Sequence, residues 1–142
     1  MPTRAQLSAT EAYKEGHTPL MRAALAGDTK AVKALMAQGA DVNAKDDESR
    51  TALMFAVINM HYETVKVLLD YDADVNAVAK DGATALILAA SCGDEEIVRL
   101  LLDKDAGVFA SYVKTGKTAE TLAAEKGYTA IVELLKSRTT PR

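Results

Sequence analysis

Residues 16–27 read GHTPLMRAALAG, and the Thr-Pro-Leu inside this stretch returns twice as Thr-Ala-Leu. The first residues of these triplets are Thr18, Thr51 and Thr84, so the period is 33 residues. A weaker copy begins at Thr118, after a step of 34 residues. Self-similarity at a fixed period of about 20–50 residues is the signature of stacked repeat architectures. The sequence therefore predicts a solenoid in which neighbouring copies bury each other's apolar faces.

Each copy carries the pattern of two short helices. After the threonine, apolar residues recur at i, i+3 and i+4, as at Leu20, Ala23 and Ala24. A threonine directly before such a run is a favoured N-cap, and Pro19 suits the first helical position. A second run of the same spacing follows, and a tail such as GADVNA at residues 39–44 has the composition of a turn. We therefore expect all-α units of helix, turn, helix and a closing loop or hairpin.

These residues resemble the ankyrin repeat, whose pattern is roughly G-x-T-P-L-H-x-A-A-x-x-G-x-x-x-V-V-x-x-L-L-x-x-G-A-D-V-N. Residues 16–43 follow it closely, and the resemblance covers about residues 13–135. It implies L-shaped units of two antiparallel helices with a projecting β-hairpin, stacked so that hairpins and inner helices line a concave side. We treat residues 1–142 as one domain with an N-terminal cap at 1–12, including a short helix at about 3–10, and four units at about 13–45, 46–78, 79–112 and 113–138.

Several positions depart from this pattern. Where it has a turn glycine, the sequence has Met60, Asp72 and Asp105. A residue other than glycine in a left-handed cap costs roughly 1 kcal/mol, so we expect strained turns there. In the fourth unit, Glu120 and Lys136 occupy core positions, as is typical of a terminal repeat with a wettable outer face. We expect the array to end at this unit, and such irregularities favour a natural sequence over an idealised design.

The composition disfavours several classes of protein. Hydrophobic residues make up 49% of the chain and charged residues 26%, which is a globular balance. The net charge of −3 disfavours nucleic acid as a partner, because phosphate-binding domains usually show a basic face. No apolar run approaches the length of a membrane span, and the first residues lack the apolar stretch of a secretory signal. We therefore expect a monomeric, cytoplasmic protein without a membrane partner.

No group of residues has the spacing of a catalytic or metal site. His17 and His61 are far apart in the chain, and the single cysteine, Cys92, excludes an internal disulfide or a cysteine-cluster zinc site. The sequence contains neither G-x-S-x-G nor a phosphate-binding glycine loop. We interpret His61 as structural, at the start of a second helix, and Cys92 as an inert thiol. We therefore expect no enzymatic activity, no cofactor and no metal.

Two sets of charged residues are interpreted as solvated surface. Lys33, Lys66 and Arg99 share one position in successive second helices. Such rows most often add solubility and short-range pairing rather than a binding site. The acidic run at residues 46–48 lacks the alternating oxygen ligands and bidentate glutamate of a calcium loop. We therefore interpret it as a solvated hairpin tip.

A sharper signal lies on the first helix of each unit, where residues four apart share a face. Under the resemblance, these stripes run side by side along the concave groove and expose one apolar patch; methionine in such a patch adapts to varied partners. The alternative is that several of these side chains pack between repeats, and spacing alone leaves both interpretations open. The apolar patch would contain Met21, Leu25, Met54, Ile58 and Ile87. The stripes are completed by His17, Arg50, Ala83, Ser91, Lys117, Thr121 and Glu125.

The resemblance implies a protein-binding module without a chemical step. We expect the hairpin tips to set specificity, and their change from acidic in unit two to basic in unit four would orient a dipolar partner. The alternatives are a structural or engineered scaffold without a natural ligand, and an enzyme or a nucleotide- or RNA-binding module. The tip residues expected to meet the partner are Lys14, Glu15, His17, Asp47, Glu48, Arg50, Lys80, Asp81 and Lys117.

The loop between units three and four breaks the pattern. Phe109 stands where the earlier units have Asn43 and Asn76, an extra residue follows, and Tyr112 lies just beyond. Two aromatic residues this close together either cover the seam onto the last unit or form a binding anchor. We favour seam packing, because the last unit is the most polar and needs apolar cover.

Overall fold

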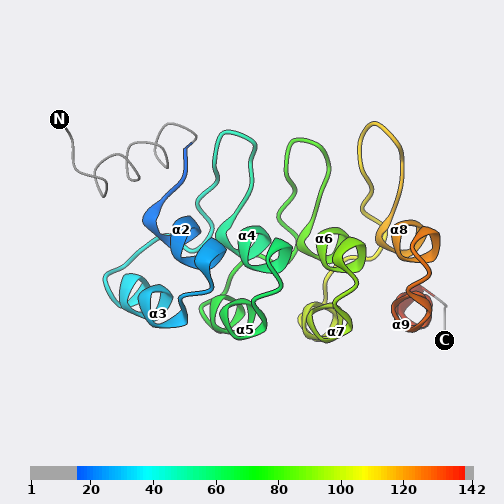
Figure 1. Ribbon diagram of the computed structural model, residues 1–142. Helices are drawn as coiled ribbons and strands as arrows, with labels where there is room; N and C mark the ends of the chain where they lie inside the picture. The colour runs from blue at the N-terminus through cyan, green and yellow to red at the C-terminus, as the bar shows by residue number, and fades with distance from the viewer. Residues whose placement is uncertain (1–15, 140–142) are drawn as a thin grey trace.

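The computed structural model describes residues 16–139, so the cap predicted at 1–12, together with Lys14 and Glu15, lies outside the described residues. Within 16–139 the chain forms four antiparallel helix pairs (Figure 1). The inner helices are α2 (Pro19–Ala26), α4 (Ala52–Ile58), α6 (Ala85–Cys92) and α8 (Ala119–Glu125). The outer helices are α3 (Thr29–Ala37), α5 (Tyr62–Asp70), α7 (Glu95–Asp103) and α9 (Thr129–Thr139).

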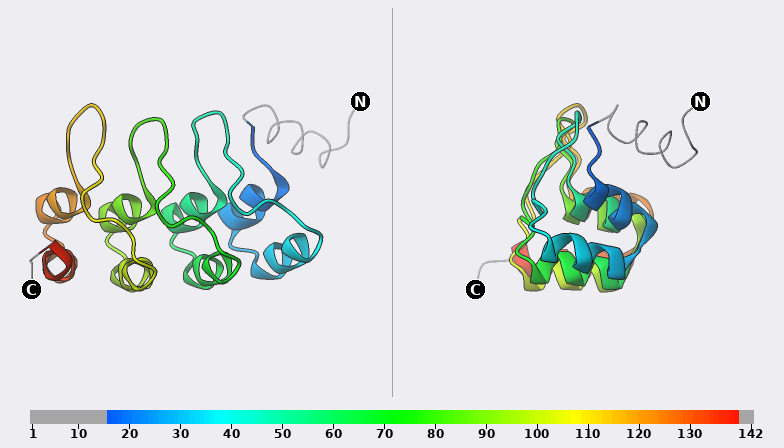
Figure 2. Two further views of the ribbon diagram at one scale, coloured as in Figure 1. Left: turned by 180° about the vertical axis from the view of Figure 1, so that it is seen from behind. Right: turned by 90° about the vertical axis from the view of Figure 1, so that its left-hand side faces the viewer.

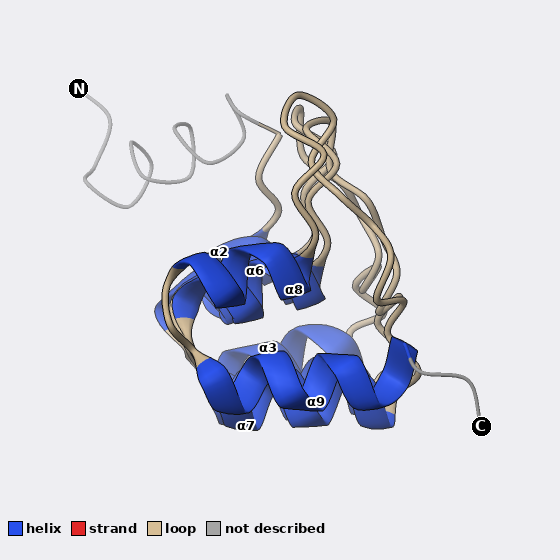
Figure 3. Ribbon diagram, turned by 90° about the vertical axis from the view of Figure 1, so that its right-hand side faces the viewer, coloured by secondary structure: helices blue, strands red, loops and turns tan. Residues whose placement is uncertain are grey.

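The helices form two layers from which the loops project at one end. Figure 3 shows α2, α6 and α8 in one layer and α3, α7 and α9 in the other, with the loops rising beside the inner layer. Figure 2 shows the same L-shaped profile repeated along the stack. Each inner helix packs mainly on its neighbours, α2 on α4, α4 on α6 and α6 on α8, as expected of a repeat array. The predicted all-α solenoid is confirmed.

The projecting loops differ from the β-hairpins that the resemblance implied. Across residues 16–139, the strand-like pairing amounts to one isolated antiparallel bridge between Ser111 and Thr118. Each loop instead closes through one backbone hydrogen bond across the base of its tip and a second one inside the tip. The projections are therefore tight loops that stand in a row.

Every inner helix begins at the predicted threonine cap. Each threonine Oγ1 accepts the backbone N–H three residues ahead, which satisfies one of the amide groups that a helix start leaves without a partner. The donor–acceptor distances are 3.2 Å at Thr18, 3.4 Å at Thr51, 3.3 Å at Thr84 and 3.2 Å at Thr118. Local sequence therefore determines where these helices start.

The predicted strained turns are confirmed. Met60, Asp72 and Asp105 have φ values of 56°, 66° and 61°, in the left-handed region that favours glycine. Gly27, which ends α2, has a φ of 71° and takes the same conformation without a Cβ penalty. The three substituted turns hold this conformation because the packed helices on either side determine it.

The core is an aliphatic layer between the inner and outer helices. Val32, Val65 and Val98 occupy equivalent positions in three outer helices and are fully buried. Ala56 and Ala89 are equally buried in the inner helices, and their small side chains allow neighbouring helices to approach closely. In the last unit, the two polar residues that occupy core positions of the repeat pattern keep contact with water: Lys136 is exposed and Glu120 is half-buried.

The structure contradicts the predicted seam packing of Phe109, which is 75% exposed. The extended segment around it alternates between two faces. Val108, Ala110 and Tyr112 pack against the core, whereas Phe109 and Val113 face solvent. Because successive side chains of an extended segment point to opposite sides, only one of the two aromatic residues can cover the seam, and Tyr112 does so.

Candidate functional site

Three loop tips stand in a row beside the inner helices (Figure 1). We call them tip two (residues 47–49), tip three (80–82) and tip four (113–116). Tip four is one residue longer than the others, so the extra residue noted in the sequence lies in the tip and not beside Phe109. The closing hydrogen bonds run from Asp46 N to Arg50 O (3.0 Å), from Ala79 N to Ala83 O (2.9 Å) and from Tyr112 N to Lys117 O (3.0 Å).

Backbone hydrogen bonds join neighbouring tips. The N–H of Lys80 donates to the carbonyl of Glu48, and the N–H of Val113 donates to the carbonyl of Asp81, both at 2.9 Å. Gly82 permits the second approach, because a Cβ there would lie 2.5 Å from the carbonyl oxygen of Ser111. The backbone hydrogen bonds therefore join the three tips into one row.

The base of tip two contains a buried carboxylate, which corrects the interpretation of residues 46–48 as a solvated run. The side chain of Asp46 is fully buried. Its Oδ1 accepts the backbone N–H groups of Glu48 (2.9 Å) and Arg50 (2.7 Å). Its Oδ2 accepts Arg50 Nε at 2.8 Å and lies 3.3 Å from His17 Nε2. Burial raises the pKa of Asp46, but the hydrogen bonds and charge of Arg50 outweigh it, so the net pKa is lowered.

Two of the residues predicted to meet a partner belong to this cluster. The Arg50 guanidinium carbon lies 5.1 Å from the ring centroid of Phe55, and the His17 ring meets Phe55 edge-on with centroids 5.0 Å apart. About a third of the Arg50 side chain remains exposed, against 16% of His17. His17 therefore helps to hold unit one against unit two, whereas Arg50 binds within unit two and keeps the larger open surface.

The apolar patch predicted on the inner helices is only partly present. Met21, Met54 and Ile87 are each 1% exposed and belong to the core, so for them the alternative of packing between repeats is correct. Leu25 and Ile58, one helical turn further on, are 41% and 37% exposed. Residues that share one face of an inner helix, such as Met54 and Ile58, therefore differ in their exposure to solvent.

The loops explain this difference. Met54 packs in one cluster with Ala77, Ala79 and Ala83, which lie in the loop that leads into the next unit. The loop thus covers the first turn of the inner helix, directly after the threonine cap. The last turn lies beyond the reach of the loop and leaves Ile58 open to solvent.

The ends of the inner helices are linked by a ladder of side-chain hydrogen bonds. In three successive units, a carbonyl of the last helical turn accepts a donor from the next unit. The bonds run from Asn59 Nδ2 to Leu25 O (2.7 Å), from Cys92 Sγ to Ile58 O (3.7 Å) and from Lys126 Nζ to Ser91 O (2.8 Å). Because these carbonyls have no partner within their own helix, the ladder both satisfies them and aligns the units.

The same ladder explains His61 and Cys92. His61 Nε2 lies 3.0 Å from the carbonyl of Leu25, which requires the tautomer with hydrogen on that nitrogen, and the ring packs on Gly27. Burial raises the pKa of the Cys92 thiol, although Lys126 partly opposes this. A raised pKa reduces the reactive thiolate fraction, in keeping with the inert thiol expected from the sequence. Both residues therefore have structural roles.

A second ladder crosses the loops and was missed by the sequence analysis. Asn43 Oδ1 accepts the backbone N–H of Asp74, and Asn76 Oδ1 accepts that of Gly107, both at 2.7 Å. The repeated asparagine was visible in the sequence, but its partner lies in the next unit. Phe109, at the third equivalent position, has no side-chain amide oxygen to accept such a bond and cannot continue this ladder.

A family model for ankyrin repeats, three copies, matches residues 4–79 and 73–141. The chain belongs to the ankyrin repeat family. Ankyrin repeats are generally protein–protein interaction modules, and the family is typically non-catalytic. No curated protein matches the chain.

The other residues predicted on the inner-helix stripes of this ankyrin repeat protein differ in exposure. Ala83 is buried and Ser91 is half-buried, whereas Thr121 is exposed at the start of α8. Lys117 and Glu125 form an ion pair at 2.9 Å. Lys114, an exposed cation in the lengthened tip four, was not among the residues predicted to meet a partner. The exposed charged residues of the three tips are Asp47, Glu48, Lys80, Asp81 and Lys114.

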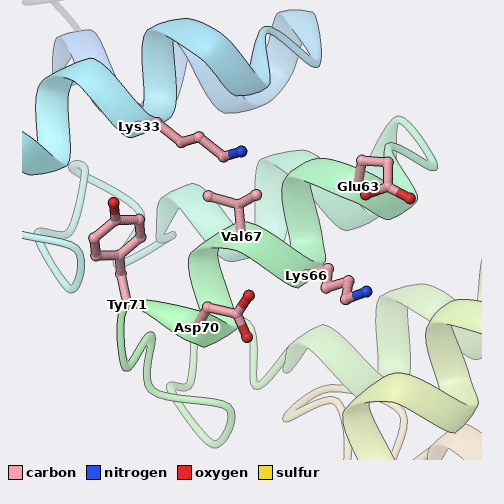
Figure 4. A pocket seen from close by; sticks show the side chains of 6 residues that line it. All are labelled: Lys33, Glu63, Lys66, Val67, Asp70 and Tyr71. Carbon is pink, nitrogen blue, oxygen red and sulfur yellow. The ribbon is translucent and has the colours of Figure 1, made fainter.

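The outer layer of the ankyrin repeats carries a shallow hollow with balanced charge. Figure 4 shows Lys33 from α3 and Glu63, Lys66 and Asp70 from α5, with Tyr71 beside them. The two cations are part of the basic row predicted from the sequence, and the two acids offset them. In residues 16–139, no three His, Cys, Asp or Glu side chains gather as a metal site would require, and no helix is both long and apolar enough to span a bilayer.

Proposed function

We propose that this ankyrin repeat chain binds a protein through its concave face, the inner corner between the inner helices and the loop tips. The observation that carries the proposal is the pair of exposed aliphatic side chains, Leu25 and Ile58, at equivalent positions of adjacent helices. Exposed apolar surface with a polar rim is typical of interaction sites. Arg50 and the charged tip residues supply that rim.

The rigidity of the face supports binding without rearrangement. The bond from Asn59 to Leu25 fixes the end of one inner helix against the next, and the bond from Lys80 to Glu48 fixes neighbouring tips. A preorganised surface loses little conformational entropy when it binds, so more of the contact energy is available as affinity. The proposal involves no chemical step and no cofactor.

We also propose that the protein is a monomer and that it acts in the cytoplasm. The described residues contain one cysteine, Cys92, as a free thiol, which suits a reducing compartment. The Leu25–Ile58 surface is also small, so we propose that it serves a separate partner and does not hold two copies together permanently.

The experiment compares two double variants of equal charge. Leu25→Glu/Ile58→Glu alters the concave face, whereas Tyr71→Glu/Val78→Glu alters residues that are 41% and 47% exposed on the outer helix end and the loop. Wild-type protein is used to capture a partner from a lysate, and the purified partner is titrated against all three proteins by calorimetry. We expect the concave variant to weaken Kd at least about tenfold and the control to leave it unchanged.

Circular dichroism and the melting temperature show whether both variants fold. Equal affinity of the folded concave variant and the wild type would contradict the proposal. Binding of RNA or nucleotide, with no protein bound at the concave face, would favour the alternative nucleotide- or RNA-binding module instead.

A further inference from the structure

The loop tips carry a charge gradient along the stack. Tip two bears Asp47 and Glu48, tip three bears Lys80 and Asp81, and tip four bears Lys114. All five side chains belong to exposed residues. The tips therefore run from doubly acidic, through neutral, to basic.

Ion pairs inside the protein leave this gradient in place. Arg50 is engaged by the buried Asp46 and so does not offset the two exposed acids of tip two. At the other end, Lys117 and Glu125 neutralise each other at 2.9 Å. Lys126, at the C-terminal end of α8, donates to the carbonyl and hydroxyl oxygens of Ser91, so it does not offset the charge of tip four.

The last turns of the inner helices, at the ends away from the tips, change in the same direction along the stack. Leu25 and Ile58 present exposed aliphatic side chains in units one and two. The equivalent position of unit three is Ser91, and unit four contributes the ion-paired Glu125. The surface thus combines apolar contacts with acidic tips at one end and polar contacts with basic groups at the other.

The row of tips sets the spacing between the two charged ends. Neighbouring packed helices lie about 8–10 Å apart, so tips two and four are separated by roughly 16–20 Å. A helix that rises about 1.5 Å per residue covers this distance in roughly 11–13 residues. The separation exceeds the Debye length of about 8 Å at physiological ionic strength, so the two ends attract charges independently.

We propose that the partner of the concave face is a helical protein segment with segregated charge. Its basic and apolar residues lie against units one and two, and its acidic residues, about three turns away, lie against unit four. The charge gradient makes the segment bind in one direction, because the reversed segment would set like charges against each other at both ends. An apolar helix face seated between such rims is a common recognition mode. This inference rests on the concave-face binding proposed above.

A displayed library of random peptides about 16 residues long, long enough to span the two ends as a helix, tests the inference. Peptides are selected on the full chain and counter-selected on Leu25→Glu/Ile58→Glu. We expect the retained peptides to carry basic and apolar residues in one half and acidic residues in the other. Retained peptides without charge segregation would overturn the inference and leave concave-face binding intact, whereas no retained peptide would count against both.

Charge reversal with matched controls tests the direction of binding. Asp47→Lys/Glu48→Lys makes tip two basic, and Glu63→Lys/Asp70→Lys makes the same change in net charge on exposed residues of α5. At about 50 mM salt, we expect the tip variant to weaken a selected peptide at least about tenfold and the control less than about twofold, with the difference shrinking at high salt. Equal effects would overturn the inference.

A second copy of the chain could also occupy the concave face, because its own charged tips could pair with those of the first copy in the opposite direction. Sedimentation of the wild type and the tip variant separates the two cases. We expect a monomer at every concentration. A dimer that dissociates in Asp47→Lys/Glu48→Lys would overturn the inference, because the concave face would then be self-complementary.

Discussion

Asp46 and Arg50 are joined twice, since the Asp46 carboxylate accepts the backbone N–H of Arg50 at 2.7 Å and its Nε at 2.8 Å. The pair closes the base of tip two around a fully buried carboxylate. One carboxylate therefore determines both the path of the loop and the position of a cation on the concave face.

Asp46→Asn should destabilise the protein. The amide leaves Arg50 without its charged partner and places donors against donors, so we expect a loss of about 1–3 kcal/mol in the free energy of unfolding. Asp47→Asn, at an exposed residue of the same loop, should cost less than about 0.5 kcal/mol. Urea denaturation measures both, and equal effects of the two variants would show that the buried network contributes nothing specific.

The stabilising effect of Asp46 should disappear in acid. Its pKa in the folded protein is lowered, so its contribution is fully present above the unfolded value of about 3.9 and is lost as the pH falls through the folded pKa. The difference in unfolding free energy between wild type and Asp46→Asn should therefore be constant near neutral pH and narrow below about pH 4. Urea midpoints measured along a pH series provide the comparison; a difference that persists at low pH would contradict the prediction.

Phe109 and Tyr112 should respond oppositely to truncation. Phe109 is 75% exposed, so Phe109→Ala should change stability by less than about 0.5 kcal/mol and leave amide exchange in α8 and α9 unchanged. Tyr112 packs against both apolar clusters, so Tyr112→Ala should cost about 2–4 kcal/mol and accelerate exchange there. Faster exchange in the Phe109 variant would restore the seam role that its exposure contradicts.

Glycine should stabilise the strained turns. Met60 has a φ of 56° and is 54% exposed, so Met60→Gly should relieve the conformational penalty and lose little packing. We expect a gain of up to about 1 kcal/mol, and Met60→Ala, which keeps the Cβ, should show no such gain. Asp72→Gly and Asp105→Gly should behave alike. Thermal unfolding measures all four variants, and equal melting temperatures for Met60→Gly and Met60→Ala would contradict the argument.

The features that depend on local chemistry could be predicted from the amino-acid sequence. A threonine before an apolar run caps a helix wherever it stands, so the start at Thr18 and its counterparts was predictable. The left-handed turns at Met60 and Asp72 were predictable too, because the repeat aligns them with glycines. The period of 33 residues identified the stack, since units of this size bury their apolar faces only against copies of themselves.

Which side chains remain exposed could not be predicted in this way, because exposure depends on how neighbouring units pack. Met54 and Ile58 share a helix face in the sequence, but a loop covers the first and leaves the second open. Asp46 reads as one acid in a solvated run and is buried because Arg50 and Glu48 supply its donors. Phe109 looks like seam cover and faces solvent because Tyr112 occupies the inner side of the same segment. Spacing specifies the direction of a side chain relative to its own helix or strand, whereas burial depends on what a neighbouring unit places against it.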